Sequence, residues 1–237
     1  MEDTFCTPPS RVDDAVCRSH MTFTDASVLA AQRLQMVDAQ LRARGIADER
    51  VLDAMARVPR HEFVAERYRD QAYEDYPLPI GEGQTISQPF IVALMLEMLE
   101  FAATDKVLEV GTGSGYVTAL LCNLAARVVS VERHAALADS ARTKLEGLGY
   151  KNARVMVGDG CNGYAPEAPY NAILVSAAAS AVPSVLLAQL AEGGRMVIPV
   201  GSAESQQLQL IRMRNGVPQT TFCELCRFVP LVPGNGA

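Results

Sequence analysis

The chain has 237 residues, of which 49% are hydrophobic and 20% charged, and its formal net charge is -6. This composition is that of a globular protein large enough for one α/β domain with additions. The acidic balance argues against a nucleic-acid groove, because phosphate binding depends on clustered Lys and Arg. No apolar run is long enough to span a membrane. We therefore expect neither nucleic acid nor a membrane as a partner, and we expect a monomer.

The first 27 residues mix Pro, Ser, Thr and acidic residues without periodicity, which is typical of a disordered extension. The first 20 lack the apolar stretch of a secretory signal, so a cytoplasmic location is expected. The six cysteines are scattered without a scaffold pattern, as free thiols in that compartment would be.

A helical lead-in follows this extension. Apolar residues at 34, 37 and 41 predict a helix over 29–44 that ends at Gly45. Asp48 is the expected N-cap of a second helix over 49–57. Residues 76–89 are rich in proline and glycine and are predicted as a loop, ahead of a helix over 90–99.

The most informative stretch is Val107-Leu-Glu-Val-Gly-Thr-Gly-Ser-Gly-Tyr116, an apolar strand that runs into a turn with three glycines. Glycines allow positive φ and remove Cβ atoms, so the backbone of this turn can approach a ligand, and a helix is expected over 117–124. Glu109 is expected near the carboxyl end of the strand, where open α/β sheets bind ligands. The GxGxG spacing suits S-adenosylmethionine (SAM) at least as well as a dinucleotide. A tight connection without a ligand is the alternative.

Three further strands are predicted over 128–132, 153–157 and 172–175. Glu132 ends the first of them, 17 residues beyond Gly115, close to the spacing at which an acid reaches a ribose hydroxyl. Asp159 follows the second between two glycines, where it could accept from an adenine amino group, and Ser176 follows the third. These strand ends predict one shared ligand crevice. Capping of helices or turns by Glu132 and Asp159 is the structural alternative.

No metal site is expected. The three histidines are scattered along the chain. Cys223 and Cys226 lie on a strand predicted over 221–229, where residues three apart point to opposite faces and cannot share a metal.

Six segments match a known family in order and spacing. They are Gly83-Gln-Thr-Ile-Ser-Gln-Pro89, Leu108-Glu-Val-Gly-Thr-Gly-Ser-Gly-Tyr116, Ser130-Val-Glu-Arg133, Gly158-Asp-Gly160, Ile198-Pro-Val-Gly201 and Arg227-Phe-Val-Pro-Leu231. The pattern resembles that of the protein-L-isoaspartate O-methyltransferases over residues 29–232. The GQTIS loop joined to the glycine turn is specific to this family, whereas many SAM enzymes share the glycine turn alone.

The resemblance implies an α/β fold with a doubly wound, largely parallel sheet of the SAM-dependent methyltransferase (Rossmann-like) type and N-terminal helical additions. One methyltransferase domain is expected over 28–237, after the extension at 1–27. Within it, 28–100 would hold the helical lead-in and substrate loop, and 101–237 the SAM-binding core and C-terminal strands. Asn171 stands where the family usually has Asp, at the amino end of a strand, so its effect is expected to be structural and small.

By resemblance, the chain would methylate the free carboxylate of L-isoaspartyl residues in damaged proteins or peptides, leaving S-adenosyl-L-homocysteine and starting repair through a succinimide. Because that carboxylate is ionised at neutral pH, no general base is needed. The family's catalytic positions correspond to Ser87 and Thr85, and substrate contacts are expected from Ile86, Ser176 and Arg227. Cofactor contacts are expected from Glu109, Gly111, Thr112, Gly113, Ser114, Gly115, Glu132, Asp159 and Gly160.

Two other functions stay open at the level of the sequence. One is a related O-methyltransferase that acts on a peptide aspartate in natural-product synthesis. The other is a SAM-binding protein without turnover, against which the intact residues Ser87, Thr85 and Glu109 argue.

Overall fold

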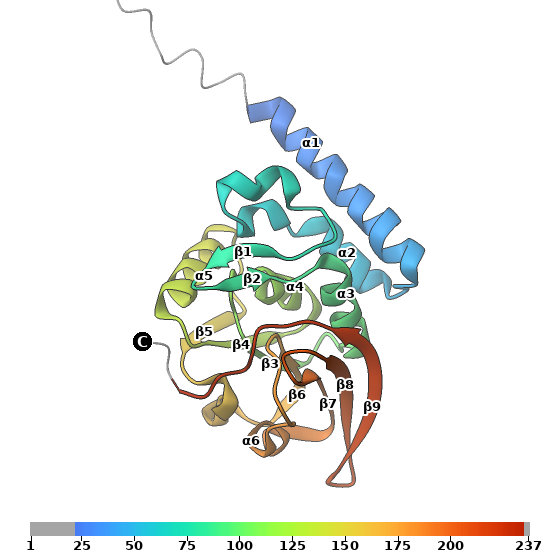
Figure 1. Ribbon diagram of the computed structural model, residues 1–237, viewed down its shortest axis with the longest axis vertical. Coiled ribbons are helices and arrows are strands. Elements are labelled where there is room, and N and C mark those ends of the chain that lie inside the picture. Colours follow the sequence, from blue (N-terminus) through green and yellow to red (C-terminus); the bar gives the residue numbers. More distant parts are fainter. Residues whose placement is uncertain (1–21, 235–237) are drawn as a thin grey trace, which may run out of the picture.

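The computed structural model describes residues 22–234, with side chains described from residue 26. Its centre is a seven-stranded sheet in the order β5-β4-β3-β6-β7-β8-β9 (Figure 1). The strands are β3 (Lys106–Val110), β4 (Arg127–Glu132), β5 (Ala153–Val157), β6 (Tyr170–Val175), β7 (Leu190–Gly201), β8 (Gln206–Arg214) and β9 (Val217–Cys226). The first five strands in this order, β5, β4, β3, β6 and β7, are parallel to one another. Strands β8 and β9 extend the sheet with antiparallel pairing. The order reverses between β3 and β6, which is the switch point at which doubly wound sheets bind ligands.

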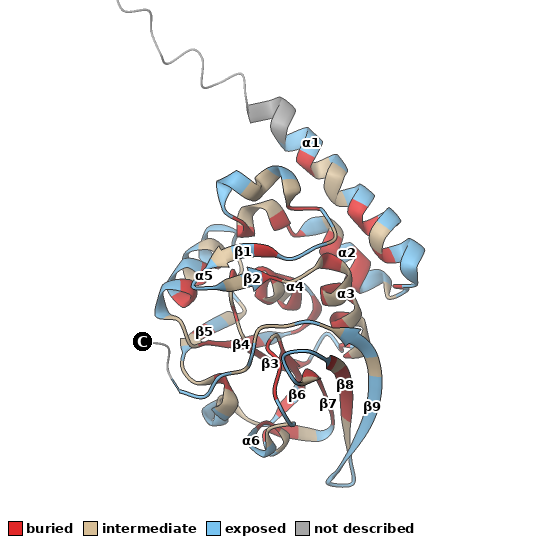
Figure 2. Ribbon diagram, in the orientation of Figure 1, coloured by how far each residue is buried: buried red, intermediate tan, exposed pale blue. Residues whose placement is uncertain are grey.

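Helices cover both faces of the sheet, as the predicted doubly wound fold requires. The main ones are α3 (Pro89–Met98), α4 (Tyr116–Leu124), α5 (Ala135–Gly147) and α6 (Ser184–Leu187), with short 3-10 turns η5 (Gly160–Asn162) and η6 (Ala165–Glu167). Val107 of β3 belongs to the apolar cluster that contains residues of α3, α4 and α5, whereas its neighbour Leu108 belongs to the cluster on the α6 side. Because both faces are covered, the central strands are mostly apolar. Figure 2 shows these strands buried and β9 exposed.

The lead-in is helical, but it is not one regular helix. Helix α1 (Thr22–Gln35) passes into a π-helix η1 (Met36–Leu41) and a 3-10 turn η2 (Arg42–Arg44), and Gly45 ends the segment in the left-handed region, as predicted. The π-turn shifts the phase of the apolar face, so Leu34 is 53% exposed while Met36 is buried. The disorder predicted for the first 27 residues is wrong for residues 22–27, which belong to α1, and the remainder of that prediction lies outside the described residues.

The second lead-in helix agrees with the sequence. Helix α2 (Glu49–Arg57) begins after Asp48, whose Oδ1 accepts a hydrogen bond from the Arg50 amide at 2.9 Å. Two 3-10 turns follow it, η3 (Arg60–Phe63) and η4 (Glu66–Gln71). No helix formed by residues 22–234 has the length and apolarity needed to cross a membrane.

The segment predicted as a loop over 76–89 contains a β-hairpin. Its strands β1 (Leu78–Gly81) and β2 (Gln84–Ile86) pair antiparallel, and its turn holds positive φ at Gly81, Glu82 and Gly83. The prolines and glycines that suggested a loop are needed for this turn and for a bulge between Pro79 and Gly81.

The predicted opposite orientation of Cys223 and Cys226 is wrong. A register shift in the β8–β9 ladder, between Gln207 and Gln209, interrupts the alternation of β9 at this point. Both thiols consequently pack against the same apolar cluster. They are free cysteines, and among the described residues no group of three or more His, Cys, Asp or Glu side chains is placed to hold a metal ion.

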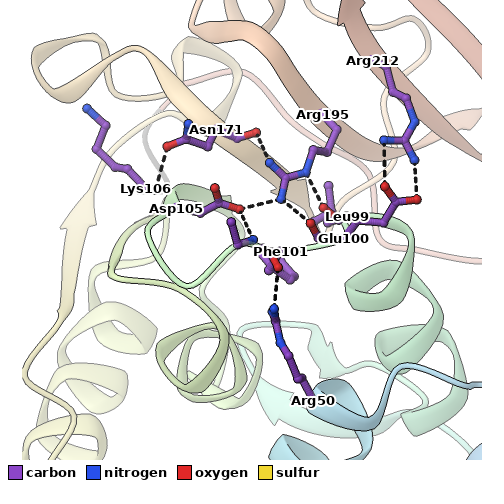
Figure 3. A network of polar contacts seen from close by, with 10 residues as sticks. Arg50, Leu99, Glu100, Phe101, Asp105, Lys106, Asn171, Arg195 and Arg212 are labelled. Atoms are coloured by element: carbon purple, nitrogen blue, oxygen red, sulfur yellow. Dashed lines mark hydrogen bonds and ion pairs between the residues drawn. The ribbon is translucent and has the colours of Figure 1, made fainter.

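At the amino edge of the sheet, a buried arginine joins β7 to the end of α3 (Figure 3). Arg195 donates to the carbonyls of Leu99, Glu100 and Asn171 and forms an ion pair with Asp105 at 2.5 Å. Asn171 also accepts the Lys106 amide through Oδ1 at 2.9 Å. Asn171 is therefore structural, as predicted.

Candidate active site

A cleft opens at the switch point, over the carboxyl ends of β3, β4 and β6. It has about 910 Å³ of empty space, its open mouth included, which suits a ligand of nucleoside-cofactor size. Four walls surround it. They are the β2 end with Ser87, the glycine turn with the first residues of α4, the end of β4 with His134, and a segment near the C-terminus that contributes Val229 to Val232.

The glycine turn has the geometry that the sequence predicted. Gly111, Gly113 and Gly115 all have positive φ. A Cβ on Gly113 would lie 3.2 Å from Cδ1 of Ile80 in the β1–β2 hairpin, so the hairpin and the turn approach closely over the cleft. A Cβ on Gly115 would lie 3.2 Å from the Ala141 Cβ, so this glycine serves the packing of α5 and does not line the cleft.

Glu132 lines the cleft at the end of β4 and is only 5% exposed. Its Oε2 accepts the Gly113 amide at 2.9 Å, and its Oε1 accepts the His134 amide at 3.0 Å. The carboxylate thereby fixes the middle of the glycine turn. Each oxygen retains a second lone pair for a ligand hydroxyl, so the capping alternative and the ligand role are compatible.

Glu109 does not line the cleft, which corrects the expectation drawn from its place near a strand end. Its side chain lies on the helix side of β3, fully buried, where Oε2 accepts the Thr118 hydroxyl at 2.6 Å. Its other oxygen has no hydrogen-bond partner among the described residues. Burial raises the pKa of Glu109 to about 7.

Asp159 also lies outside the cleft, and its carboxylate is committed to the chain itself. It caps η5 by accepting the Cys161 amide at 2.8 Å, and its Oδ2 accepts the Gly234 amide at 2.8 Å. Burial alone would raise the pKa of Asp159, but these backbone hydrogen bonds outweigh it and hold the pKa below its usual value. The capping alternative therefore describes Asp159 better than the predicted adenine contact.

The residues 228–234, named here the C-terminal strap, cross the cleft between β9 and Asp159. The Ala178 amide donates to the Val229 carbonyl at 2.8 Å, and the Leu231 amide donates to the Ala178 carbonyl at 2.7 Å. Gln206 holds the start of the strap by accepting the Phe228 amide at 2.6 Å. The apolar strap residues line the cleft, whereas the predicted contact residue Arg227 does not.

One wall of the cleft is formed by the loop that joins β2 to α3. Ile86 is buried, Thr85 is exposed at the rim, and Ser87 follows them. Ser87 and Ser176 both line the cleft, and both also line a small apolar pouch behind it that includes Val92 and Phe228. Two hydroxyl-bearing residues thus lie at a boundary between the open cleft and apolar packing.

Most of the predicted site residues meet in this one cleft. Those that line it are Thr85, Ile86, Ser87, Gly111, Thr112, Gly113, Ser114, Glu132, Gly160 and Ser176, and those that do not are Glu109, Gly115, Asp159 and Arg227. Sequence reasoning missed other lining residues, namely Gln84, Val110, Tyr116, Val117, Val131, Arg133, His134, Ala177 and Val229 to Val232. The Arg227-Phe-Val-Pro-Leu231 motif contains apolar strap residues that line the cleft, but its charged residue, Arg227, does not line it.

The chain is similar to known proteins over most of its length. Residues 31–236 match the family model described as Protein-L-isoaspartate(D-aspartate) O-methyltransferase (PCMT). A protein-L-isoaspartate O-methyltransferase from Koribacter versatilis is 58% identical over 212 residues, which are 90% of this chain and 96% of that protein. One from Methanoculleus marisnigri is 54% identical over 208 residues, 88% of this chain and 94% of that protein.

A solved structure from Plasmodium falciparum, described as a beta-aspartate methyltransferase in complex with S-adenosyl-L-homocysteine, has a TM-score of 0.74 at 26% identity. The match covers 84% of this chain and 98% of that one. The chain therefore belongs to the protein-L-isoaspartate(D-aspartate) O-methyltransferase family.

Proposed function

We propose that this chain transfers a methyl group from SAM to the free carboxylate of L-isoaspartyl residues in damaged proteins or peptides, which starts their repair. The observation that carries the proposal is the single cleft in which the glycine turn and Glu132 meet the Ser87 loop. The family match over residues 31–236 supports it. Free thiols at the described cysteines are compatible with the cytoplasmic location that we also propose.

On the cofactor side, Glu132 accepts the ribose hydroxyls through the lone pairs that its two backbone contacts leave. The glycine turn lets the backbone approach the rest of the cofactor without Cβ atoms in the way. The strap covers the same space with apolar side chains. Bound there, SAM supplies an electrophilic methyl group on a sulfonium sulfur.

On the acceptor side, the hydroxyls of Ser87 and Ser176 donate hydrogen bonds to the carboxylate and hold one of its oxygens toward the cofactor. Thr85, at the rim, contacts the peptide. The chain has no proton to remove, because the acceptor carboxyl is ionised at neutral pH. Val92 and Phe228 keep water away from the two serines, which strengthens their hydrogen bonds to the carboxylate. Positioning of the carboxylate against the methyl group is then the main source of the rate enhancement.

Transfer of tritium from methyl-labelled SAM to an isoaspartyl peptide and to its aspartyl twin tests this function. We expect label in the isoaspartyl peptide only. Ser87→Ala should lower kcat about 10 to 1,000-fold, since one positioning hydrogen bond is lost in a dry site, while SAM affinity stays the same. Ser202→Ala, which removes a hydroxyl that accepts only nearby loop amides, is the matched control and should keep kcat.

Each other outcome favours a different function. Label in the aspartyl peptide would favour a methyltransferase that acts on peptide aspartate. Tight SAM binding without label in either peptide would favour a SAM-binding protein without turnover.

A further inference from the structure

Arg60 is a fully buried arginine at the start of η3, outside the cleft. Its Nε donates to the Ala72 carbonyl at 2.7 Å, and its Nη2 donates to the Ser87 carbonyl at 2.8 Å. Its Nη1 has no hydrogen-bond partner among the described residues. A buried cation is costly, and an apolar side chain of similar volume would fill the same space. The guanidinium therefore calls for a reason beyond packing.

The contacts of Arg60 reach both sides of the cleft. One is the backbone of Ser87, in the loop that joins β2 to α3. Another is the ring of Tyr116, at the start of α4, whose centroid lies 4.9 Å from the guanidinium carbon. Tyr116 itself lines the cleft. Since a guanidinium is planar and its donors have fixed directions, it can hold these two walls at a defined separation.

Asp75 fixes the chain on the other side of Ser87. Its Oδ2 accepts the Gln88 side-chain amide at 2.7 Å, and its Oδ1 accepts the Phe90 backbone amide at 3.1 Å. Asp75 is itself paired with Arg44 at 2.5 Å. The residues just after Ser87 are thus held by a carboxylate, while the carbonyl of Ser87 is held by Arg60.

We propose that Arg60 is a positioning residue for methyl transfer, which sets the direction of the Ser87 side chain by fixing its carbonyl against the Tyr116 wall. The proposal rests on the proposed role of Ser87. A hydrogen bond to a carbonyl fixes the plane of the peptide that follows, and with it the direction of the Cα–Cβ bond. Displacement of a positioning group by about 1 Å can lower a rate about 100-fold.

The test is a double-mutant cycle between Arg60 and Ser87, with kcat for an isoaspartyl peptide and SAM affinity as readouts. Arg60→Met keeps much of the volume and removes the donors. Arg60→Lys keeps the charge, but one ammonium group cannot donate in both fixed directions. We expect kcat to fall about 10- to 100-fold in Arg60→Met and less in Arg60→Lys, with SAM affinity within about threefold of the parent.

The decisive result is the double variant. If Arg60 acts through the Ser87 hydroxyl, Arg60→Met added to Ser87→Ala should lower kcat no further than about twofold. Arg195→Met is the matched control, because it removes another buried arginine that binds carbonyls, at the far edge of the sheet. Any loss of kcat that it causes should multiply with that of Ser87→Ala.

The proposal is overturned if the losses from Arg60→Met and Ser87→Ala multiply, or if Arg60→Met leaves kcat unchanged while Ser87→Ala lowers it. In both cases the role of Ser87 survives and only that of Arg60 fails. If Ser87→Ala itself has no effect, both fail together. If Arg60→Met does not fold, Arg60→Lys takes its place in the cycle. Loss of folded protein with both substitutions would assign Arg60 to stability alone and overturn the proposal.

Discussion

At the scale of single residues, two acidic side chains near the glycine turn have different surroundings. Glu132 is held by two backbone amides at the wall of the cleft, and Glu109 is buried against Thr118 away from it. Two amide hydrogen bonds orient the Glu132 carboxylate at the wall of the cleft. Burial raises the pKa of Glu109 and so favours its neutral form. The first environment suits recognition of hydroxyl groups, and the second does not.

Glu132→Ala should weaken SAM binding by about 1 to 3 kcal/mol, because the ribose hydroxyls and the amides of Gly113 and His134 lose their acceptor. Calorimetric titration with SAM measures this loss. Glu109→Gln is the matched control, since it alters the neighbouring acid without touching the cleft, and its SAM affinity should stay within about threefold. Equal losses of SAM affinity in the two variants would show that Glu109 also contributes to cofactor binding.

Glu109→Gln should change the pH dependence of stability. The pKa of Glu109 is raised from 4.5 to about 7 by burial, so between these pH values the folded state binds more protons than the unfolded state. The free energy of unfolding of the parent therefore falls as pH rises through this window, by at most about 3 kcal/mol. The Gln variant lacks this titration. Urea unfolding at pH 5 and pH 8 should show it gaining stability relative to the parent, and identical pH profiles would contradict the assignment.

At the scale of elements, the cleft depends on two covers that come from distant parts of the chain. The β1–β2 hairpin lies over Gly113, and the C-terminal strap runs from Gln206 to Asp159. The strap is held by Gln206 at its start, by the backbone of Ala178 in its middle and by Asp159 at its end. We therefore expect the grip on the cofactor to depend on these end contacts as well as on the residues that line the cleft.

Asp159→Ala should release the end of the strap and weaken SAM binding several-fold, with a loss of stability near the 1 kcal/mol expected for a lost cap. Calorimetry and thermal unfolding measure the two effects. Asp48→Ala is the matched control, because it removes a capping carboxylate far from the cleft, at the start of α2. It should lower Tm by a similar amount and leave SAM affinity unchanged.

A chain ended at Val232 separates the strap from a direct contact of Asp159 with the cofactor. It lacks the Gly234 amide but keeps the carboxylate. If the strap explanation holds, this chain should reproduce the weaker SAM binding of Asp159→Ala. Unchanged affinity would show that Asp159 acts on the ligand itself.

The strands and the glycine turn could be predicted because their signals are local. Strand β4 is mostly apolar and ends in Glu132, and glycine at position 111 permits the positive φ that the turn adopts. The direction of the Glu109 side chain could not be predicted in this way. It depends on which element packs against that face of β3, and here that element is α4, through Thr118. The β1–β2 hairpin was missed because proline and glycine serve a bulged hairpin as well as a loop.

The path of the strap over the cleft could not be predicted for a different reason. Its partners Ala178 and Asp159 lie more than 50 residues away along the chain, and their contacts are mostly backbone hydrogen bonds that leave no pattern in side chains. The π-turn at Met36–Leu41 had the same effect on a smaller scale. The π-turn shifts the buried face of the lead-in by about one residue. Leu34 is therefore exposed, whereas a regular helix would place it on the same buried face as Leu41.

At the scale of the whole molecule, the carboxyl and amino ends of the strands, called here the two edges of the sheet, have different roles. The carboxyl edge carries the cleft, the glycine turn and both covers. The amino edge carries the Arg195 network, which ties β7 to the end of α3 through Leu99, Glu100 and Asp105 (Figure 3). Arg50 adds a contact from α2 to the Phe101 carbonyl at 2.7 Å. Stability and chemistry are thus separated along the strand axis.

Arg195→Met tests this separation. The substitution leaves Asp105 buried without its cation and three carbonyls without a donor, a change that costs about 3 to 5 kcal/mol when one partner of a buried ion pair is removed. For a domain of this size, Tm should fall by about 6 to 20 °C. Thermal unfolding measures this loss, and kcat and SAM affinity at 20 °C should remain those of the parent, because every proposed site residue lies at the other edge.

Arg212→Met is the control for this prediction. It removes a neighbouring arginine that pairs with Glu100 at 2.8 Å, but that glutamate side chain is 65% exposed, so the pair should contribute less than about 1 kcal/mol. Arg212→Met should therefore change Tm by no more than about 4 °C. If Arg195→Met lowers SAM affinity or kcat in the folded protein, the amino edge also shapes the cleft. The two edges would then be coupled through β6 and β7, which run from one to the other.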